Sequence, residues 1–196
     1  MANLVETPSG WERAALAAEK VKERLLRSTA ALERAGIAYA VIGGNAVAEW
    51  VGRVDEDAVR NTRDVDLLIR RSDLEAAKAA LAPAGFVYCR SFDVDMFLDG
   101  PNGRPTSAVH LLFAGEKVRA DDSAETPEVA DSEAAAGFRV VSLSALVQMK
   151  LTSFRLKDRV HLLDLIGVGQ IDQTWPARLP AVLAARLQEL LDNPNG

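Results

Sequence analysis

Residues 37–51 read IAYAVIGGNAVAEWV, a short apolar run followed by two glycines and a helical pattern. Residues 37–42 have the length of a strand, and residues 45–51 have the spacing of a helix. Gly43 and Gly44 allow a tight turn between the two and leave backbone N–H groups exposed at the positive end of the helix. A strand, a glycine pair and a helix in this order predict a seat for phosphate, although a glycine pair alone is also typical of a plain turn.

The next apolar run, NTRDVDLLI at residues 61–69, carries two aspartates two positions apart. In a strand, Asp64 and Asp66 point to the same face, about 7 Å apart. Two carboxylates on one face of an apolar strand repel each other, and they persist where a cation lies between them or where solvent bathes them. Oxygen ligands suit Mg²⁺, which proteins often hold with one or two carboxylates and the phosphates of a substrate. We therefore predict a metal site at these two residues, with a solvated strand end as the alternative.

Together and in this order, the motifs VIGGNAVAEW and NTRDVDLLI resemble the signature of the nucleotidyltransferase superfamily. The likeness is greatest to its minimal and toxin-like branch, which includes the abortive-infection (AbiEii-type) nucleotidyltransferases. In that branch a later helix carries a lysine, an arginine and an aspartate. The segment MKLTSFRLKDRVHLLDLI at residues 149–166 is similar, with Lys150, Arg155, Lys157 and Asp158. The resemblance covers residues 37–166 and implies an α/β or α+β fold with a small mixed sheet.

The resemblance implies an enzyme that transfers a nucleoside monophosphate from a nucleoside triphosphate to a hydroxyl acceptor. Mg²⁺, with Mn²⁺ as the alternative ion, would bind Asp64 and Asp66, and these two residues would form the catalytic group with His110. The nucleotide would contact Gly43, Gly44, Asn45, Lys150 and Arg155. The resemblance also implies a relation to toxin–antitoxin pairs, with an antitoxin as partner. The acceptor stays open among tRNA, a protein side chain and a small molecule, and the acidic balance of the chain weakly disfavours a large RNA.

The sequence departs from the family pattern at three places. The segment Arg53–Arg63 lengthens the link between the glycines and the aspartates and is therefore an insertion. Asn45 stands where many members have a serine, although an amide can also hydrogen-bond to phosphate. The family usually has a third carboxylate on a later strand, and the matching motif AVHLLFAGE at residues 108–116 has His110 instead. Imidazole is a poor ligand for Mg²⁺ beside carboxylates. His110 could instead be a general base, or the protein could be a catalytically impaired relative that binds nucleotide, RNA or a partner protein.

Other residues in the chain are weaker candidates for the site. Asp93, Asp95 and Glu116 could supply the missing carboxylate, but for each of them a solvated strand or loop position is the simpler interpretation. His161 has no second histidine or cysteine at zinc spacing, so we predict no zinc site. Trp50 could stack on a base, but core packing is the expected role of a tryptophan on this helix.

We expect a single domain over residues 1–196, with a helix at 10–35, a core at 37–166 and a helical tail at 170–192, so that helices flank the sheet at both ends of the chain. Within the core, the patterns predict one or two strands at 86–98, a turn at 99–103, a strand at 108–113, a loop or marginal helix at 121–136, a short strand at 140–141 and one helix at 145–166.

The composition is that of an ordinary globular chain, with 48% hydrophobic and 26% charged residues and a net charge of −5. The single cysteine, Cys89, cannot form an internal disulfide, which fits a reducing compartment. The N-terminal residues lack the basic start and apolar stretch of a signal peptide, and no apolar run is long enough to span a membrane. We therefore expect a soluble cytoplasmic protein of bacterial type with no membrane partner.

Overall fold

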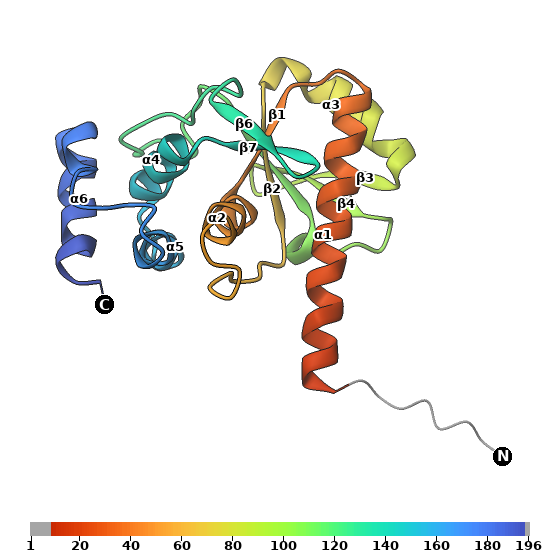
Figure 1. Cartoon of the computed structure of the whole chain (residues 1–196). Helices are drawn as coiled ribbons and strands as arrows, with labels where there is room; N and C mark the ends of the chain where they lie inside the picture. Colours follow the sequence, from red (N-terminus) through yellow and green to blue (C-terminus); the bar gives the residue numbers. More distant parts are fainter. Residues whose placement is uncertain (1–8, 195–196) are drawn as a thin grey trace.

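The computed structural model describes residues 9–194 and shows one mixed sheet with helices on both of its faces (Figure 1). Residues 1–8, on which the expectation of no signal peptide rests, lie outside the described residues. The helices are α1 (Gly10–Arg34), α2 (Gly43–Gly52), α3 (Leu74–Leu81), α4 (Leu143–Ser153), α5 (Leu156–Gly167) and α6 (Ala181–Asp192). The strands are β1 (Tyr39–Ile42), β2 (Val65–Ile69), β3 (Phe86–Ser91), β4 (Val94–Asp99), β5 (Val109–Phe113), β6 (Ser132–Ala135) and β7 (Phe138–Val141). This architecture confirms the predicted fold class.

The strands lie in the order β3-β4-β5-β2-β1-β7-β6. At the centre, β2 runs antiparallel to β1 and parallel to β5, and β7 joins the other side of β1 in parallel. The register places Asp66 opposite Ile42 on β1 and opposite His110 on β5. The strand that precedes the glycine pair, the strand with the two aspartates and the strand with the histidine are therefore neighbours.

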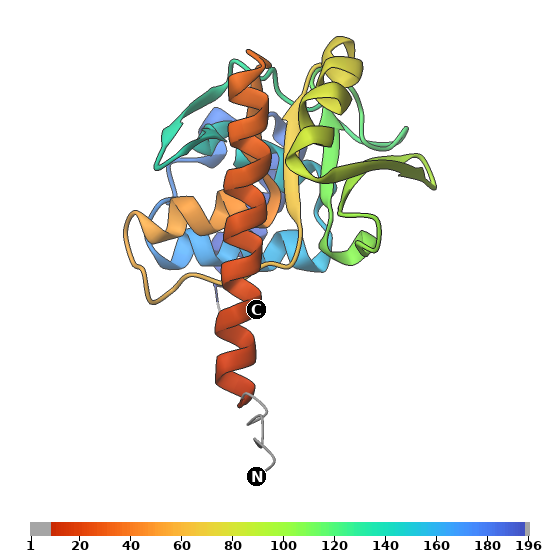
Figure 2. The ribbon, with the colours of Figure 1, turned by 90° about the vertical axis from the view of Figure 1, so that its right-hand side faces the viewer.

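Different helices cover the two faces of the sheet (Figures 1 and 2). Val65, Leu67 and Ile69 of β2 pack in one core cluster with residues of α1 and α3, whereas Leu68 packs in the other cluster with residues of α2, α4, α5 and α6. Successive side chains of a strand point to opposite faces, so Asp66 lies on the same face as α4 and α5. A slip of one residue would move these buried side chains to the wrong face, and this fixes the position of Asp66.

The N-terminal helix matches its predicted start and end. Ser9 and Glu12 form the predicted capping box, and Gly36 adopts a left-handed φ of +68° directly after the helix. The first half of α1 extends beyond the sheet (Figure 2). Among residues 9–194, no helix is both long enough and apolar enough to cross a membrane.

The region after β7 forms two helices, so the prediction of one helix at 145–166 was wrong. Ser142 caps α4 by accepting a hydrogen bond from the backbone N–H of Ala145. α4 ends at Phe154, which adopts the left-handed conformation with φ of +45°. α5 begins two residues later, and the Asp158 carboxylate accepts a hydrogen bond from the backbone N–H of Arg155.

The remaining strands refine the other predictions. Residues 86–98 hold two strands, β3 and β4, which form an antiparallel hairpin. The predicted turn at 99–103 begins the connection from β4 to β5, and these strands pair antiparallel as expected. The segment 121–136 is mostly loop but ends in β6, an edge strand that pairs with β7.

Candidate active site

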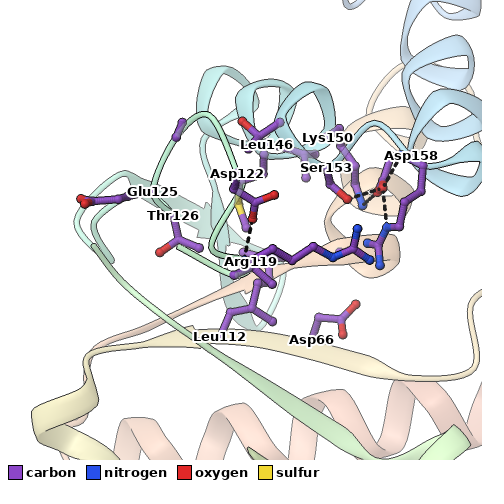
Figure 3. A pocket seen from close by; sticks show the side chains of 17 residues that line it. Asp66, Leu112, Arg119, Asp122, Glu125, Thr126, Leu146, Lys150, Ser153 and Asp158 are labelled. Atoms are coloured by element: carbon purple, nitrogen blue, oxygen red, sulfur yellow. Dashed lines mark hydrogen bonds and ion pairs between the residues drawn. The ribbon is translucent and has the colours of Figure 1, made fainter. Parts of the chain in front are cut away.

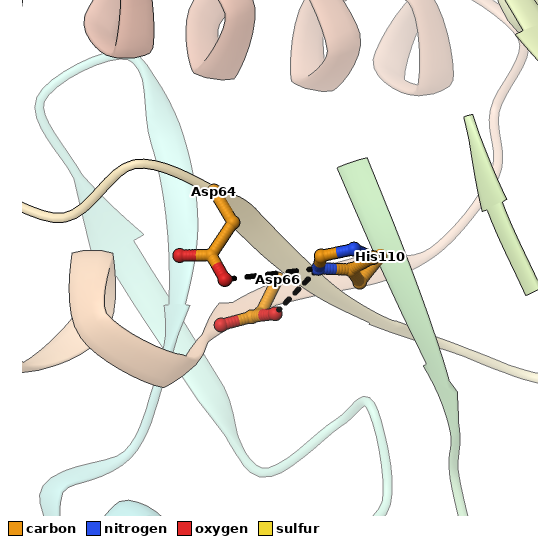
Figure 4. A group of neighbouring side chains, drawn as sticks. All are labelled: Asp64, Asp66 and His110. Carbon is orange, nitrogen blue, oxygen red and sulfur yellow. Dashed lines mark ion pairs between the residues drawn. The ribbon is translucent and has the colours of Figure 1, made fainter. Parts of the chain in front are cut away.

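Asp64, Asp66 and His110 form a compact group where β2 and β5 begin and β1 ends (Figure 4). One donor atom from each residue lies within 4.8 Å of the donor atoms of the other two. His110 Nδ1 lies 3.8 Å from Asp64 Oδ2 and 3.5 Å from Asp66 Oδ1. The structure therefore brings together the three residues that the sequence predicts as the catalytic group.

Asp64 is held in place by two neighbours. The Thr62 hydroxyl donates a hydrogen bond of 2.7 Å to Asp64 Oδ1, and the Asn45 amide donates one of 2.8 Å to the backbone carbonyl of Asp64. Burial raises the pKa of Asp64, but the Thr62 hydrogen bond and the charge of Lys157 offset this effect, so that the pKa lies below its usual value of 3.8. Asp64 is thus ionised at neutral pH. The Asn45 side chain thus orients Asp64, and its predicted contact with phosphate stays a prediction.

His110 is oriented by contacts on both of its ring nitrogens. Nε2 lies 3.0 Å from the carbonyl oxygen of Pro105. A carbonyl can only accept, so Nε2 carries a proton and Nδ1 faces the two carboxylates. A hydrogen bond with Asp66 raises the pKa of His110, burial lowers it, and the charges of Asp66 and Asp64 raise it again, which leaves the pKa above its usual value of 6.5.

The two glycines are required by close contacts as well as by the turn. Gly43 begins α2 with a left-handed φ of +68°, and a Cβ atom there would lie 1.9 Å from Asp66 Oδ2. A Cβ atom on Gly44 would lie 2.9 Å from the Thr62 hydroxyl oxygen. Each glycine therefore makes room for a residue that belongs to the carboxylate site or supports it.

A cavity of about 140 Å³ opens beside Asp66, between the glycine turn and helices α4 and α5 (Figure 3). Its lining includes Gly43 and Asp66 on one side and Lys150, Arg155 and Asp158 on the other. Figure 3 shows Lys150 and Asp158 together on the wall opposite Asp66. Four of the predicted site residues therefore share one cavity.

The helix wall of the cavity is an ionic network centred on the buried carboxylate of Asp158. Lys150 Nζ lies 3.2 Å from Asp158 Oδ1, and the Ser153 hydroxyl and Arg155 Nε donate hydrogen bonds of 2.7 and 3.0 Å to Asp158 Oδ2. Burial raises the pKa of Asp158, but Lys150, Ser153 and Arg155 stabilise the carboxylate and bring the pKa below 3.8. One carboxylate thus faces two cations, so the wall keeps a net positive charge toward the cavity.

The structure adds three residues to this region that the motifs leave without a role. Thr62 supports Asp64, and the Lys157 charge lowers the pKa of that carboxyl. Arg119 comes from the loop between β5 and β6, and its side chain extends over the cavity on the side of Asp66 (Figure 3). Among the described residues, the Arg119 guanidinium makes no hydrogen bond or ion pair. No sequence pattern around Arg119 indicates this position, because loop conformation places it.

The other carboxylates considered as third ligands lie elsewhere. Asp95 is opposite Leu111 in the register of β4 and β5, so it points to the α1 face of the sheet, away from His110. Asp93 is exposed in the turn between β3 and β4. Glu116 forms an ion pair with Arg71. None of the three belongs to the group of Asp64, Asp66 and His110, so the side-chain positions do not support the less favoured alternative that one of them is the third carboxylate.

Trp50 on α2 and His161 on α5 are buried side chains on the face of the sheet that also carries Asp66. Trp50 is buried and donates a hydrogen bond of 3.0 Å from Nε1 to the carbonyl of Val141, as expected for a core tryptophan. His161 is buried in α5, and its Nδ1 has no hydrogen-bond partner within the described part of the chain.

No protein-family model and no curated protein matches this sequence. Among solved structures, the chain is similar to the antibiotic-resistance factor ANT(2″)-Ia in solution, with 17% identity and a TM-score of 0.57 over 88% of this chain and 93% of that one. A crystal structure of ANT(2″)-Ia in complex with adenylyl-2″-tobramycin gives 17% identity and a TM-score of 0.52 over 87% and 98% of the two chains.

A third similar structure is an antigenic nucleotidyltransferase-like protein from Paracoccidioides brasiliensis, with 16% identity and a TM-score of 0.57 over 91% of each chain. At such low identity the likeness concerns the fold, and the more specific resemblance to the abortive-infection branch stays a prediction from the motifs. The chain has the fold of the nucleotidyltransferases.

Proposed function

We propose that the protein transfers a nucleoside monophosphate from a nucleoside triphosphate to a hydroxyl acceptor with the help of a divalent cation. The observation that carries the proposal is the pair Asp64 and Asp66 beside a cavity whose opposite wall holds Lys150 and Arg155. The complex of the structural neighbour ANT(2″)-Ia with adenylyl-2″-tobramycin supports it, because that ligand carries an adenylyl group.

The donor set at the sheet edge fits a divalent cation. Asp64 and Asp66 each direct one carboxylate oxygen to the space in front of His110. When bound there, a divalent cation would offset the charge of the triphosphate and of the leaving pyrophosphate. Mg²⁺ is the ion that the sequence predicts, with Mn²⁺ as the alternative.

The chain's own residues would bind and orient the nucleotide in the cavity. In the transfer, the acceptor oxygen forms a bond to the α-phosphorus, the bond from that phosphorus to the pyrophosphate oxygen breaks, pyrophosphate leaves, and the hydroxyl proton passes to water. Lys150 and Arg155 face the cavity with positive charge that would stabilise the triphosphate. The first turn of α2, which begins at Gly43, would offer backbone N–H groups to phosphate.

Arg119 is included in the proposed nucleotide site because its guanidinium extends over the cavity without an ion-pair partner among the described residues. We expect Arg119→Ala to weaken binding of a non-hydrolysable nucleoside triphosphate analogue about 10-fold or more, since a hydrogen bond to a charged group contributes about 1.5–3 kcal/mol. Lys117→Ala removes a charge from the same loop but outside the cavity lining, and calorimetry should show an almost unchanged affinity. Equal losses in the two variants would mean that Arg119 acts only through the general charge of the loop.

The decisive experiment for the proposed function is label transfer from each α-labelled nucleoside triphosphate with Mg²⁺ or Mn²⁺. Total tRNA, cell lysate and a set of small hydroxyl compounds would serve as acceptors. We expect label on one acceptor class, and we expect the Asp64→Asn/Asp66→Asn variant to lose it while its circular dichroism stays native. Transfer that survives in this variant would contradict the proposed role of the carboxylates.

A catalytically impaired nucleotide-binding protein is the second candidate, and His110 in the position of the family's third carboxylate favours it. Under this alternative, no acceptor becomes labelled with any cation, while the analogue still binds with metal-dependent affinity. The link to toxin–antitoxin pairs and an antitoxin partner rests on the sequence resemblance alone. Growth arrest on induced expression that requires Asp64 would support that link.

A further inference from the structure

Each of the two carboxylates at the sheet edge has one oxygen directed at His110. Thr62 occupies Asp64 Oδ1, which leaves Oδ2 toward the histidine. Asp66 Oδ2 lies over the backbone of Gly43, which leaves Oδ1 toward the histidine. Two carboxylate oxygens and one imidazole nitrogen therefore converge on the same small space.

The contact with Pro105 fixes the tautomer of His110 in which Nδ1 can bind a metal ion. Because Nε2–H donates to the Pro105 carbonyl, the neutral ring has its lone pair on Nδ1, the atom that faces Asp64 and Asp66. Metal-binding histidines generally donate their other ring N–H to a carbonyl or a carboxylate, which fixes the tautomer and the ring orientation. His110 has this arrangement.

The separations between the donor atoms also suit a shared ion. Two donors that each lie about 2.1 Å from one cation are about 3 to 4 Å from each other. His110 Nδ1 lies 3.8 Å from Asp64 Oδ2 and 3.5 Å from Asp66 Oδ1. All three donor atoms lie within 4.8 Å of one another, so small movements of the side chains would bring them around one ion.

From this geometry we infer that His110 is a ligand of the metal and that the site prefers a first-row transition-metal dication such as Mn²⁺ to Mg²⁺. Mg²⁺ binds oxygen almost exclusively, whereas Mn²⁺ accepts carboxylate oxygen and imidazole nitrogen together. The inference rests on the proposed function, since it names the cation of the same site. His110 would then take over the role of metal ligand from the third carboxylate that the family usually has.

The competing arrangement is one in which a protonated His110 takes the place of a cation. The imidazolium would then neutralise Asp64 and Asp66 directly, and no metal–nitrogen bond would form. The two arrangements differ in whether a metal bound to the protein has a nitrogen neighbour, and this difference can be measured without any assay of activity.

Pulsed electron paramagnetic resonance of the full chain with bound Mn²⁺ tests the inference. We expect a nitrogen coupling to Mn²⁺ that changes from the ¹⁴N to the ¹⁵N pattern when the protein carries ¹⁵N-labelled histidine. The chain has two histidines, so His161→Gln is the matched control and should keep the coupling. Bound Mn²⁺ without any nitrogen coupling in the unsubstituted protein would overturn the inference.

A competition titration gives a second, independent measurement. We expect Mn²⁺ to bind the unsubstituted protein more tightly than Mg²⁺, and His110→Asp to reduce this preference about 10-fold or more, because it replaces the nitrogen donor by the oxygen that Mg²⁺ accepts. An unchanged ratio of the two affinities in a folded His110→Asp variant would contradict the role of His110 as a ligand.

The outcomes separate the inference from the proposed function. Label transfer that runs with Mg²⁺, together with Mn²⁺ spectra that lack nitrogen coupling, would keep the function and overturn the inference. Nitrogen coupling in a protein that labels no acceptor with any cation would keep the inference and favour the nucleotide-binding alternative.

Discussion

Gly43 and Asp66 come so close that no side chain fits between them. Gly43 has a left-handed φ of +68°, which L-residues adopt at a cost, and its missing Cβ would overlap Asp66 Oδ2. The identity of this residue therefore matters for two separate reasons, backbone conformation and access to the carboxylate.

Comparison with Gly36 separates these two reasons. Gly36 has the same φ of +68° but no atom within 4 Å of the position of a Cβ. Gly36→Ala should lower the free energy of unfolding by about 1 kcal/mol and leave Mn²⁺ affinity unchanged. Gly43→Ala should destabilise the protein further, because the added Cβ displaces the Asp66 carboxylate. The same displacement should weaken Mn²⁺ binding at least about 10-fold, which corresponds to a loss of about 1.4 kcal/mol in binding free energy. Urea unfolding and metal titration of both variants would measure this, and native affinity in Gly43→Ala would refute the steric argument.

The sequence predicts the residues of the site only where local spacing determines their position. Asp64 and Asp66 share a face because they are two positions apart in a strand, and the structure places them so. The close approach of His110 depends on the parallel pairing of β2 with β5, which local spacing does not show. The hydrogen bond from Asn45 to the backbone of Asp64 joins residues 19 positions apart, so the sequence does not indicate it.

Among the elements, the junction of α4 and α5 shows most clearly what periodicity misses. A continuous helical pattern crosses Phe154, yet this residue is left-handed and the helix stops there. No glycine or proline marks the break. Side-chain acceptors take up N–H groups where the helices begin, with Ser142 at α4 and Asp158 at α5. The break lets Asp158 turn back toward Lys150, which a straight helix would not do.

This junction makes a prediction about the energy of its ion pair. The Lys150–Asp158 pair joins α4 to α5 with both side chains buried, whereas the Arg159–Glu189 pair at 2.9 Å joins α5 to α6 with 41% and 53% of the side chains exposed. Asp158→Ala should cost about 3–5 kcal/mol, because it leaves Lys150 buried without its partner. Glu189→Ala should cost less than about 1 kcal/mol.

Double-mutant cycles measured by urea unfolding would test this contrast. The cycle of Lys150→Met with Asp158→Ala should give a clear coupling energy. Lys150→Met leaves the buried Asp158 carboxylate without its lysine partner, and Asp158→Ala then removes that unpaired charge. The cycle of Arg159→Ala with Glu189→Ala should give almost none. Similar coupling in both cycles would show that the α4–α5 junction gains nothing from its ionic network.

For the whole molecule, buried His161 predicts a dependence of stability on pH. Burial lowers the pKa of His161 from 6.5 to about 4, and the charges of Lys150 and Lys157 act in the same direction, while Asp158 and Asp164 oppose them. Between these two values the unfolded chain binds the proton and the folded chain does not. The free energy of unfolding should therefore rise with pH across this window, by at most about 3 kcal/mol.

Two groups of the site with shifted pKa values, His110 and Asp158, act outside this window. His110 has a raised pKa, so its contribution is complete below 6.5 and is lost as the pH rises above that value. Asp158 has a lowered pKa, so its contribution is lost only as the pH falls below about 3.8. Urea unfolding of the unsubstituted protein and of His161→Gln between pH 4 and pH 7 would check the prediction. A variant that keeps the full slope would show that His161 is not its source.

The parallel pairing of β2 with β5 also has a consequence for how the chain matures. During synthesis both aspartates leave the ribosome well before the histidine, and α3, β3 and β4 are made in between. The three donors meet only after the two central strands have found each other across that intervening stretch. Contacts between distant segments form late because closing long loops costs entropy. A cation that needs all three donors can therefore bind only after β2 and β5 have paired, and not to a partly folded chain.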